Sequence, residues 1–167
     1  MAFRCSGVVG ELESRRFSRC CGSPQGIWRG REAGRVLIFA LDSNVVIHAL
    51  KGTGRVAERF AEVNPGDISI PAVVVYELEF GTLRAGVPAR RRRELGQLIG
   101  AISILPFDDR AASRAAGLRY DLEKSGFAIG PLDALIAGTA LAHGAKLVTH
   151  NMREFARVPG LQVEDWF

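Results

Sequence analysis

The sequence contains few cysteines, and all of them lie near its beginning. Cys5, Cys20 and Cys21 precede residue 36, so residues 36–167 contain no cysteine. Disulfide bonds and thiol chemistry are therefore excluded for this larger part of the chain. Because proteins without disulfides are typical of a reducing compartment, we predict a cytoplasmic location.

Long apolar runs are also missing. No stretch approaches the roughly 20 apolar residues that a membrane-spanning helix requires, and the N-terminus lacks the continuous apolar region of a signal peptide. We therefore predict that the protein has no membrane partner. A Gly-rich phosphate loop is absent as well, because Gly52-Thr53-Gly54 is not followed by Lys and Ser or Thr.

The net charge is confined to the first 35 residues. This segment contains seven Arg and three Glu, a net charge of +4 that equals the formal net charge of the whole chain. Residues 36–167 hold 15 of the 22 basic residues and 15 of the 18 acidic residues. The sequence pI of about 9.3 therefore does not indicate that the main part of the chain binds a polyanion.

Residues 36–167 alternate between predicted strands and helices. Short apolar runs predict strands at 36–41, 67–70, 102–105, 146–149 and 161–163. Helical periodicity, with Ser43 as a cap of the first helix, predicts helices at 44–50, 54–63, 71–83, 89–99, 108–124, 132–142 and 153–155. This alternation indicates an α/β fold with a central, mainly parallel sheet that is flanked by helices on both faces.

Two aspartates occupy positions at which a metal site can form. Asp42 directly follows the predicted strand 36–41, and Asp133 lies among apolar residues where helix 132–142 begins. Each could simply be a turn or cap residue, since a helix N-terminus favours a carboxylate by about 0.3–1 kcal/mol. However, a carboxylate without a partner beside an apolar helix is costly, and a parallel sheet gathers such positions at its carboxyl edge. A bound cation would account for both residues.

A third acid is expected on the apolar helix 71–83. Glu77 and Glu79 are two positions apart and therefore point in different directions. We expect one of them to be solvated and the other to face inward or toward a cleft. The simpler alternative is that both lie on the rim of the fold.

The segment after strand 146–149 supplies three more candidates at the same sheet edge, namely Thr149, Asn151 and Glu154. Each of them alone could be an ordinary loop residue. Mg²⁺ favours oxygen ligands and is usually held by one or two carboxylates plus substrate phosphate. It would also neutralise clustered acids, whose pKa values rise when like charges repel. The pattern therefore indicates metal-assisted chemistry on a phosphodiester.

Other polar residues are secondary candidates. Side chains that could hold a polyanion are Arg90–Arg93, Arg84, Lys51 and Arg55, although the arginine run could equally be a solvated helix face. The three histidines, His48, His143 and His150, show no metal-ligand spacing with one another or with cysteine. Sequence order indicates no Ser-His-Asp or Cys-His catalytic set.

Four segments in order resemble the motifs of one family. Leu41–Ile47 (LDSNVVI) resembles the opening motif of PIN-domain ribonucleases, and Val75–Gly81 (VYELEFG) resembles the second. Ile129–Ala137 (IGPLDALIA) resembles the third, and Leu147–Gly160 (LVTHNMREFARVPG) resembles the fourth together with the segment after it. Each motif alone is a weak signal. The combination, across residues 36–167, is similar to the VapC toxins of bacterial VapBC toxin–antitoxin pairs.

This resemblance implies a PIN-like three-layer fold and a Mg²⁺-dependent endoribonuclease toxin, with Mn²⁺ as an alternative metal. Asp42, Glu77 and Asp133 would bind the metal, and Thr149 would orient the attacking water. Many PIN domains have Asp where this chain has Asn151, so either Asn151 or Glu154 would complete the site. The resemblance also implies a homodimer, an RNA substrate and a VapB-type antitoxin whose C-terminal segment blocks the site.

The resemblance leaves residues 1–35 uncovered. This segment is rich in Gly, Arg and Ser, and its lack of periodicity indicates disorder. One explanation is a translation start placed too far upstream, because valine and leucine codons, as at Val36 and Leu37, can start translation in bacteria. The alternative is a genuine basic tail that adds RNA affinity. In either case we expect one PIN domain, residues 36–167, which is long enough to bury a core.

Two other functions are compatible with parts of the pattern. A PIN fold could bind RNA or an antitoxin without cleaving RNA, although three retained acids favour catalysis. A phosphatase of the aspartate type would need a second Asp where Asn44 stands, and a response receiver would need an acid where Ser43 stands. Both phosphotransfer alternatives are therefore disfavoured.

Overall fold

The computed structural model describes residues 37–52 and 54–167 of the chain. These residues belong to a unit that spans Val36–Phe167. The predictions for residues 1–35, and for the beginning of the first strand at Val36, lie outside the described residues.

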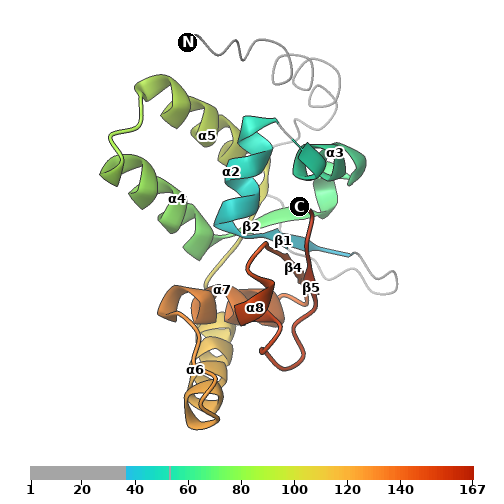
Figure 1. The fold of residues 1–167 in the computed structure, drawn as a ribbon, viewed down its shortest axis with the longest axis vertical. Coiled ribbons are helices and arrows are strands. Elements are labelled where there is room, and N and C mark those ends of the chain that lie inside the picture. Colours follow the sequence, from blue (N-terminus) through green and yellow to red (C-terminus); the bar gives the residue numbers. More distant parts are fainter. Residues whose placement is uncertain (1–36, 53) are drawn as a thin grey trace. The chain divides into compact units, whose positions relative to one another are not determined.

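A parallel sheet of five strands forms the centre of the described residues, in the order β3-β2-β1-β4-β5 (Figure 1). The strands are β1 (Phe39–Leu41), β2 (Ile68–Pro71), β3 (Ser103–Leu105), β4 (Lys146–Val148) and β5 (Val163–Glu164). Every neighbouring pair runs parallel, which confirms the predicted sheet. Strands β1 and β2 are buried along their whole length, as expected when helices cover both faces.

Seven helices surround this sheet in the described residues. They are α2 (Ser43–Lys51), α3 (Gly54–Glu62), α4 (Ala72–Arg84), α5 (Ala89–Ala101), α6 (Asp109–Lys124), α7 (Pro131–Ala142) and α8 (Met152–Phe155), with a short 3-10 helix at Pro65–Asp67. Figure 1 shows α2–α5 on one side of the sheet and α6–α8 on the other. This layering follows from right-handed crossovers, since the chain adds strands in one direction from β1 to β3 and in the other from β4 to β5.

The point at which this direction reverses lies between β1 and β4. In open α/β sheets, ligands bind beyond the carboxyl ends of the strands at such a switch point. Here Asp42 directly follows β1 and Thr149 directly follows β4. The Asp42 backbone N–H donates to the Val148 oxygen over 2.9 Å. The two residues are therefore placed at the expected position for a ligand site.

Two predicted boundaries around the first strand are wrong. The strand was expected to include residues 36–41, but β1 begins at Phe39, and Leu37 before it is 42% exposed. Ser43 was expected to cap the following helix. Instead, Asp42 is the N-cap of α2, and its Oδ1 accepts a hydrogen bond from the Ser43 backbone N–H. The capping prediction failed because a carboxylate is as good a cap as a hydroxyl.

Two other boundaries differ because of tertiary pairing. Pro71 was expected to open a helix, but it ends β2, where it pairs with Leu105 of β3, and it precedes α4 as its N-cap. The last strand was predicted at 161–163, but it is β5, Val163–Glu164, which pairs with Leu147 and Val148. Pairing with a neighbouring strand, which a single-sequence pattern does not contain, sets these limits.

Helix α7 is buried, as its apolar sequence predicted. It packs closely against α6, because a Cβ atom at Gly138 would lie 2.6 Å from the backbone nitrogen of Ala115. This close contact fixes α7 and therefore the acid in its first turn, Asp133. Among the helices of the described residues, none is both long and apolar enough to cross a membrane.

Candidate active site

Asp42 is held by three neighbouring side chains and is only 4% exposed. Its Oδ1 accepts from the Ser43 backbone N–H over 2.7 Å. Its Oδ2 accepts from the Asn44 amide over 3.0 Å and from the Thr149 hydroxyl over 2.6 Å. The carboxylate therefore has a fixed orientation and a donor for each oxygen.

A second layer of hydrogen bonds joins α2 to the loop after β4. The Asn44 side-chain oxygen accepts from the His150 backbone N–H over 3.4 Å, and the Thr149 hydroxyl oxygen accepts from the Asn151 N–H over 3.0 Å. The only proton of the Thr149 hydroxyl is donated to Asp42, so Thr149 could act toward a water only through its remaining lone pair. Sequence reasoning missed the role of Asn44, although an amide two residues after an Asp is a recognisable local partner.

Asp133 faces Glu154, and the two carboxyl groups share a hydrogen bond. Burial is the main cause that raises the pKa of Asp133, and the hydrogen bond and charge of Glu154 add to it, as do the charges of Asp42 and Glu77, so that this pKa reaches about 7. The same hydrogen bond lowers the pKa of Glu154, and the Gly130 N–H and the Asn151 side chain assist. Protonation of Asp133 is therefore favoured by the neighbouring carboxylate of Glu154. Glu154 lies beside Asp133, and Asn151 hydrogen-bonds to Glu154.

Gly130 makes room for Asp133. A Cβ atom at residue 130 would lie 2.5 Å from Asp133 Oδ2. The backbone of Gly130, with φ −57° and ψ 146°, is one that any residue can adopt, so space rather than conformation requires glycine here. Its N–H also lies 3.4 Å from Glu154 Oε2. The Gly-Pro pair at the start of α7 could have indicated a tight helix start. It does not indicate that the Asp133 carboxylate approaches Gly130 so closely.

Glu77 is the glutamate of α4 that faces inward, whereas Glu79 is exposed, as expected for one of the two. Its Oε2 is buried and has no hydrogen-bond partner in the described residues. Burial raises the pKa of Glu77 and the negative charge of Asp42 raises it further, while a hydrogen bond with Ser43 lowers it. A buried polar atom without a partner is unusual in a folded protein and needs an explanation.

The acids fit an open Mg²⁺ or Mn²⁺ site better than a closed metal cage. No group of three or more His, Cys, Asp or Glu side chains in residues 37–52 and 54–167 is arranged so that it could hold a metal ion by itself. Mg²⁺ does not need such a cage, because it keeps several waters and uses one or two protein carboxylates. A nearby cation would pair with the unpartnered Glu77 oxygen and would offset the negative charges that raise the pKa of Asp133.

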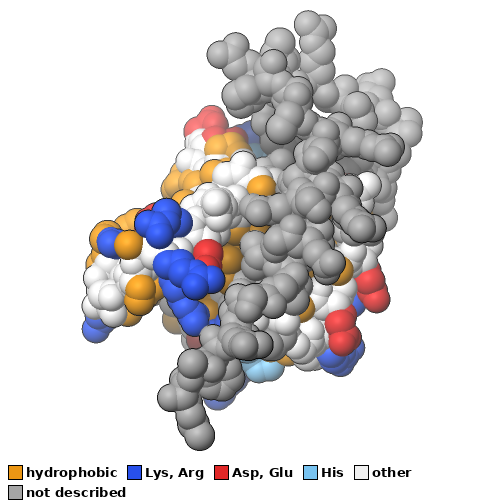
Figure 2. All heavy atoms as spheres, turned by 90° about the horizontal axis from the view of Figure 1, so that it is seen from above, with side chains coloured by type: hydrophobic (Ala, Val, Ile, Leu, Met, Phe, Trp, Pro, Cys, Tyr) orange, Lys and Arg blue, Asp and Glu red, His pale blue; other side chains and the backbone are white. Residues whose placement is uncertain are grey.

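The basic candidates lie on the surface. Arg84 and Arg90–Arg93 are exposed on α4 and α5, and Arg90 forms an ion pair with Glu94 over 3.0 Å. Figure 2 shows Lys and Arg side chains gathered among hydrophobic ones on the side where α4 and α5 lie in Figure 1. Lys51 is exposed, while Arg55 donates to the Phe167 backbone oxygen over 3.2 Å.

The histidines lie outside the group of acids. His143 Nε2 lies 3.0 Å from the Pro106 oxygen, and the rings of His48 and His150 contact Phe167.

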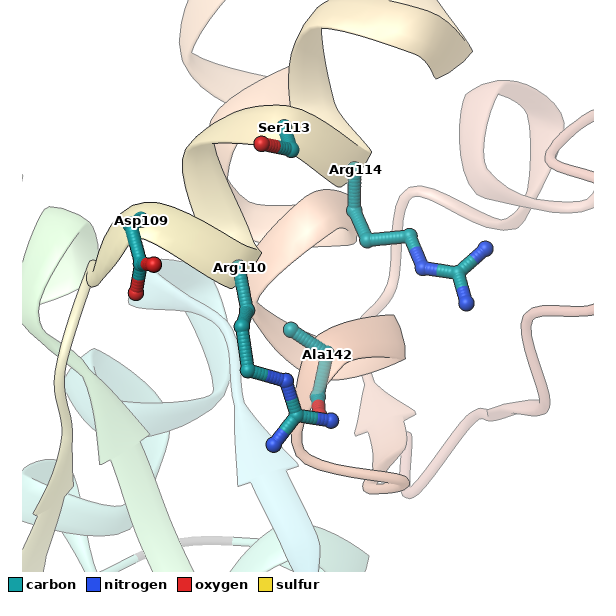
Figure 3. A pocket seen from close by; sticks show the side chains of 5 residues that line it. All are labelled: Asp109, Arg110, Ser113, Arg114 and Ala142. Carbon is teal, nitrogen blue, oxygen red and sulfur yellow. The ribbon is translucent and has the colours of Figure 1, made fainter.

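A separate pocket of about 310 Å³ lies between the beginning of α6 and the end of α7. Figure 3 shows its lining, in which the Arg110 and Arg114 side chains extend on the same side of α6. Arg110 donates to the Ala142 oxygen over 3.1 Å. Because none of the four acids lines this pocket, we do not include it in the candidate active site.

Comparison with known proteins gives a consistent result. The sequence matches the family model described as PIN domain over residues 39–161. The tRNA(fMet)-specific endonuclease VapC of Shigella flexneri is 37% identical over 132 residues, which cover 78% of this chain and 99% of the relative. Ribonuclease VapC2 of Rickettsia felis is 31% identical over 134 residues, which cover 78% of this chain and 98% of the relative.

Two solved structures with a similar fold come from VapBC complexes. A chain of VapBC2 from Rickettsia felis, bound to a promoter DNA fragment, superposes with a TM-score of 0.72 at 29% identity and covers 78% of this chain and 100% of that chain. A chain of DNA-bound VapBC from Salmonella typhimurium gives a TM-score of 0.68 at 34% identity and covers 78% of this chain and 99% of that chain.

Proposed function

We propose, starting from the fact that this chain belongs to the PIN-domain family, that Asp42, Glu77 and Asp133 bind a divalent metal for RNA hydrolysis. The chain is an endoribonuclease of the VapC type and the toxin of a toxin–antitoxin pair. The observation that carries the metal assignment is the buried, unpartnered oxygen of Glu77, close to the carboxyl groups of Asp133 and Glu154, which hydrogen-bond to each other. Glu154 acts as the fourth acid.

The residues of the site have different proposed roles. A bound Mg²⁺ or Mn²⁺ would supply a water of lowered pKa and would stabilise negative charge on the scissile phosphate. Asp42 presents a carboxylate that Ser43, Asn44 and Thr149 hold still. Asp133 and Glu154 lie close enough together that a nearby cation would favour the ionised forms of both carboxyl groups.

We propose RNA as the substrate and tRNA(fMet) as the first candidate, since two relatives at 37% and 34% identity are named as tRNA(fMet)-specific endonucleases. The exposed Arg84 and Arg90–Arg93 provide positive charge for phosphate contacts. Cleavage sites can be mapped by sequencing RNA ends after brief expression of the protein. Cuts scattered over all RNAs would argue against tRNA(fMet) as the specific target.

We propose two protein partners. A VapB-type antitoxin is supported by the VapBC complexes among the structural neighbours. A homodimer is supported by a stripe of exposed apolar side chains on α4, Tyr76, Phe80 and Leu83, which are 56%, 51% and 66% exposed. The Tyr76 and Phe80 rings stack with centroids 6.0 Å apart. Light scattering on the toxin alone tests the dimer, and a monomeric mass would exclude it.

The substitution Asp133→Ala tests the site. It should abolish Mg²⁺-dependent RNA cleavage and growth inhibition while the circular dichroism spectrum stays unchanged. Asp109→Ala is the matched control, because Asp109 is an exposed aspartate in the first turn of α6. Cleavage by Asp133→Ala at the wild-type rate would refute the site assignment. A wild-type protein that binds RNA or antitoxin without cleaving RNA in Mg²⁺ or Mn²⁺ would instead be a catalytically silent binding module.

A further inference from the structure

The ring of Phe167 lies between two imidazole rings. Its centroid is 4.6 Å from that of His48 and 4.4 Å from that of His150. His48 belongs to α2, whereas His150 follows Thr149 in the loop after β4. One aromatic side chain therefore contacts both segments that carry the hydrogen bonds of Asp42. We refer to His48, Phe167 and His150 as the aromatic clamp.

The backbone of Phe167 is held on two sides. Its N–H donates to Asp165 Oδ1 over 2.9 Å, and its oxygen accepts from Arg55 Nη1 of α3 over 3.2 Å. Asp165 Oδ2 also lies 3.3 Å from His150 Nδ1, so one carboxylate orients both the Phe167 backbone and the His150 ring.

Trp166 anchors the same segment in the core. It is fully buried, its ring lies 5.5 Å from that of Phe39, and its Nε1–H donates to Glu164 over 2.9 Å. Because Trp166 directly precedes Phe167 in the chain, its burial fixes the backbone from which the Phe167 ring reaches the histidines. The clamp is therefore built on a fixed support.

The clamp adjoins the residues that hydrogen-bond to Asp42, through α2 and the loop after β4. His48 is four residues after Asn44 and shares its face of α2. Asn44 joins the two segments through its bonds to Asp42 and to the His150 N–H. The bond to His150 is 3.4 Å long, at the weak end of hydrogen-bond distances, so it gives little rigidity by itself.

We propose that Phe167 is a positioning residue for the active site. By holding α2 against the loop after β4, it keeps Asn44 and Thr149 in hydrogen-bonding range of Asp42. Phe167 itself does not touch the four acids. This inference rests on the proposed ribonuclease function, in which Asp42 takes part in catalysis. A misplacement of about 1 Å in an active site can cost on the order of 100-fold in rate.

Steady-state kinetics with a Mg²⁺-loaded enzyme and an RNA substrate provide the first test. Phe167→Ala should lower kcat by about tenfold to 100-fold and leave KM nearly unchanged. Alanine keeps the backbone oxygen that Arg55 contacts, and the ring contacts of the clamp involve neither Arg84 nor Arg90–Arg93, which we propose hold the RNA. Phe167→Tyr keeps the ring and should restore kcat. Tyr120→Ala is the matched control, since Tyr120 is a 65% exposed aromatic residue of α6. Equal kcat values for Phe167→Ala and the wild type would overturn the proposal.

Amide hydrogen exchange on the metal-free protein gives a readout that does not depend on activity. The N–H groups of His150 and Asn151 donate to Asn44 and Thr149, so Phe167→Ala should accelerate their exchange by about tenfold or more, as local opening does. The buried amides of α7 should exchange as in the wild type. Uniform acceleration over the whole domain would mean a general loss of stability and would overturn the proposal.

The two tests separate failure of the clamp from failure of the proposed function. Selectively faster exchange at His150 and Asn151 in a protein that never cleaves RNA would leave the clamp intact and refute the ribonuclease. RNA cleavage by the wild type, together with unchanged exchange at His150 and Asn151 in Phe167→Ala, would refute the clamp and leave the ribonuclease function intact. If Phe167→Ala does not fold, His48→Leu removes one side of the clamp and leaves Phe167 in place. His48→Leu should selectively accelerate the exchange of the same amides, and unchanged exchange would overturn the proposal.

Discussion

The two halves of the acid site differ in how the protein satisfies their charge. On the strand half, Asp42 follows β1 and receives hydrogen bonds from Ser43, Asn44 and Thr149. On the helical half, Glu77, Asp133 and Glu154 lie on α4, α7 and α8 with an unpartnered Glu77 oxygen and a raised pKa of Asp133. The first half is complete within the protein, whereas the second carries more negative charge than its donors can compensate.

This difference follows from where the acids sit. Asp42 lies between the end of β1 and the start of α2, so Ser43 and Asn44 of α2 converge on it together with Thr149 after β4. Asp133 instead depends on the N-terminus of α7, which favours a carboxylate by about 0.3–1 kcal/mol. One pKa unit corresponds to about 1.4 kcal/mol, so the helix end does not offset burial and three neighbouring acids. The helical half is therefore the half that a cation would change most.

After the loss of cleavage expected for Asp133→Ala, the next largest effect is expected from Gly130→Ala, which disturbs the helical half alone. The new Cβ would lie 2.5 Å from Asp133 Oδ2, so Asp133 has to turn away from Glu154. We expect RNA cleavage to fall by about 100-fold with little change in melting temperature. Gly117→Ala in α6 is the matched control, since its Cβ would meet nothing within 4 Å. Wild-type cleavage by Gly130→Ala would show that the exact place of Asp133 is unimportant.

The next prediction compares the two halves by replacing one carboxylate in each with a neutral amide. Asp42→Asn should destabilise the protein by about 1–3 kcal/mol, because an amide nitrogen would face the Asn44 or Thr149 donor. Asp133→Asn should stabilise the metal-free protein at pH 8, because it removes a charge that the site compensates poorly. Denaturant titrations at pH 8 and pH 5 measure both changes.

The pH dependence of the Asp133→Asn effect has a definite sign. The pKa of Asp133 is raised to about 7, so the native state holds this proton more tightly than the unfolded chain does. The stability contributed by Asp133 is present at low pH and is lost as pH rises toward 7. The benefit of Asp133→Asn should therefore shrink at pH 5. The lowered pKa of Glu154 acts in the opposite direction, which makes the net change smaller. Destabilisation by both substitutions at pH 8 would remove the contrast between the halves.

The sequence was sufficient to predict the fold class and the order of the elements. Alternating strands and helices imply parallel crossovers, and the carboxyl edge of the resulting sheet is where Asp42 and Thr149 lie. The apolar pattern of residues 132–142 correctly placed a buried helix with Asp133 in its first turn. These features are local or follow from general topology.

Contacts between distant segments were not predictable in the same way. The choice between Glu77 and Glu79 depends on how α4 rotates against the sheet, which the surrounding apolar residues do not define. Gly130 is needed only because Asp133 Oδ2 approaches it, and its ordinary backbone angles give no sign of this. The pairing of Glu154 with Asp133 joins two helices that the motif pattern treats separately. Such features depend on tertiary packing.

The smallest predicted effect is a pH-dependent affinity for Mg²⁺, and it decides which half receives the cation. If Asp133 has to lose its proton when Mg²⁺ binds, only the deprotonated fraction of the protein is competent. With a pKa of about 7, that fraction is about one tenth at pH 6 and most of the protein at pH 8, so the apparent affinity should be about tenfold weaker at pH 6. Isothermal titration calorimetry at both pH values measures this, and Asp133→Asn should make binding weak and independent of pH. An equal wild-type affinity at pH 6 and pH 8 would place the cation on the Asp42 half, where the protein already satisfies the charge, and would show that the proton of Asp133 has no part in metal binding.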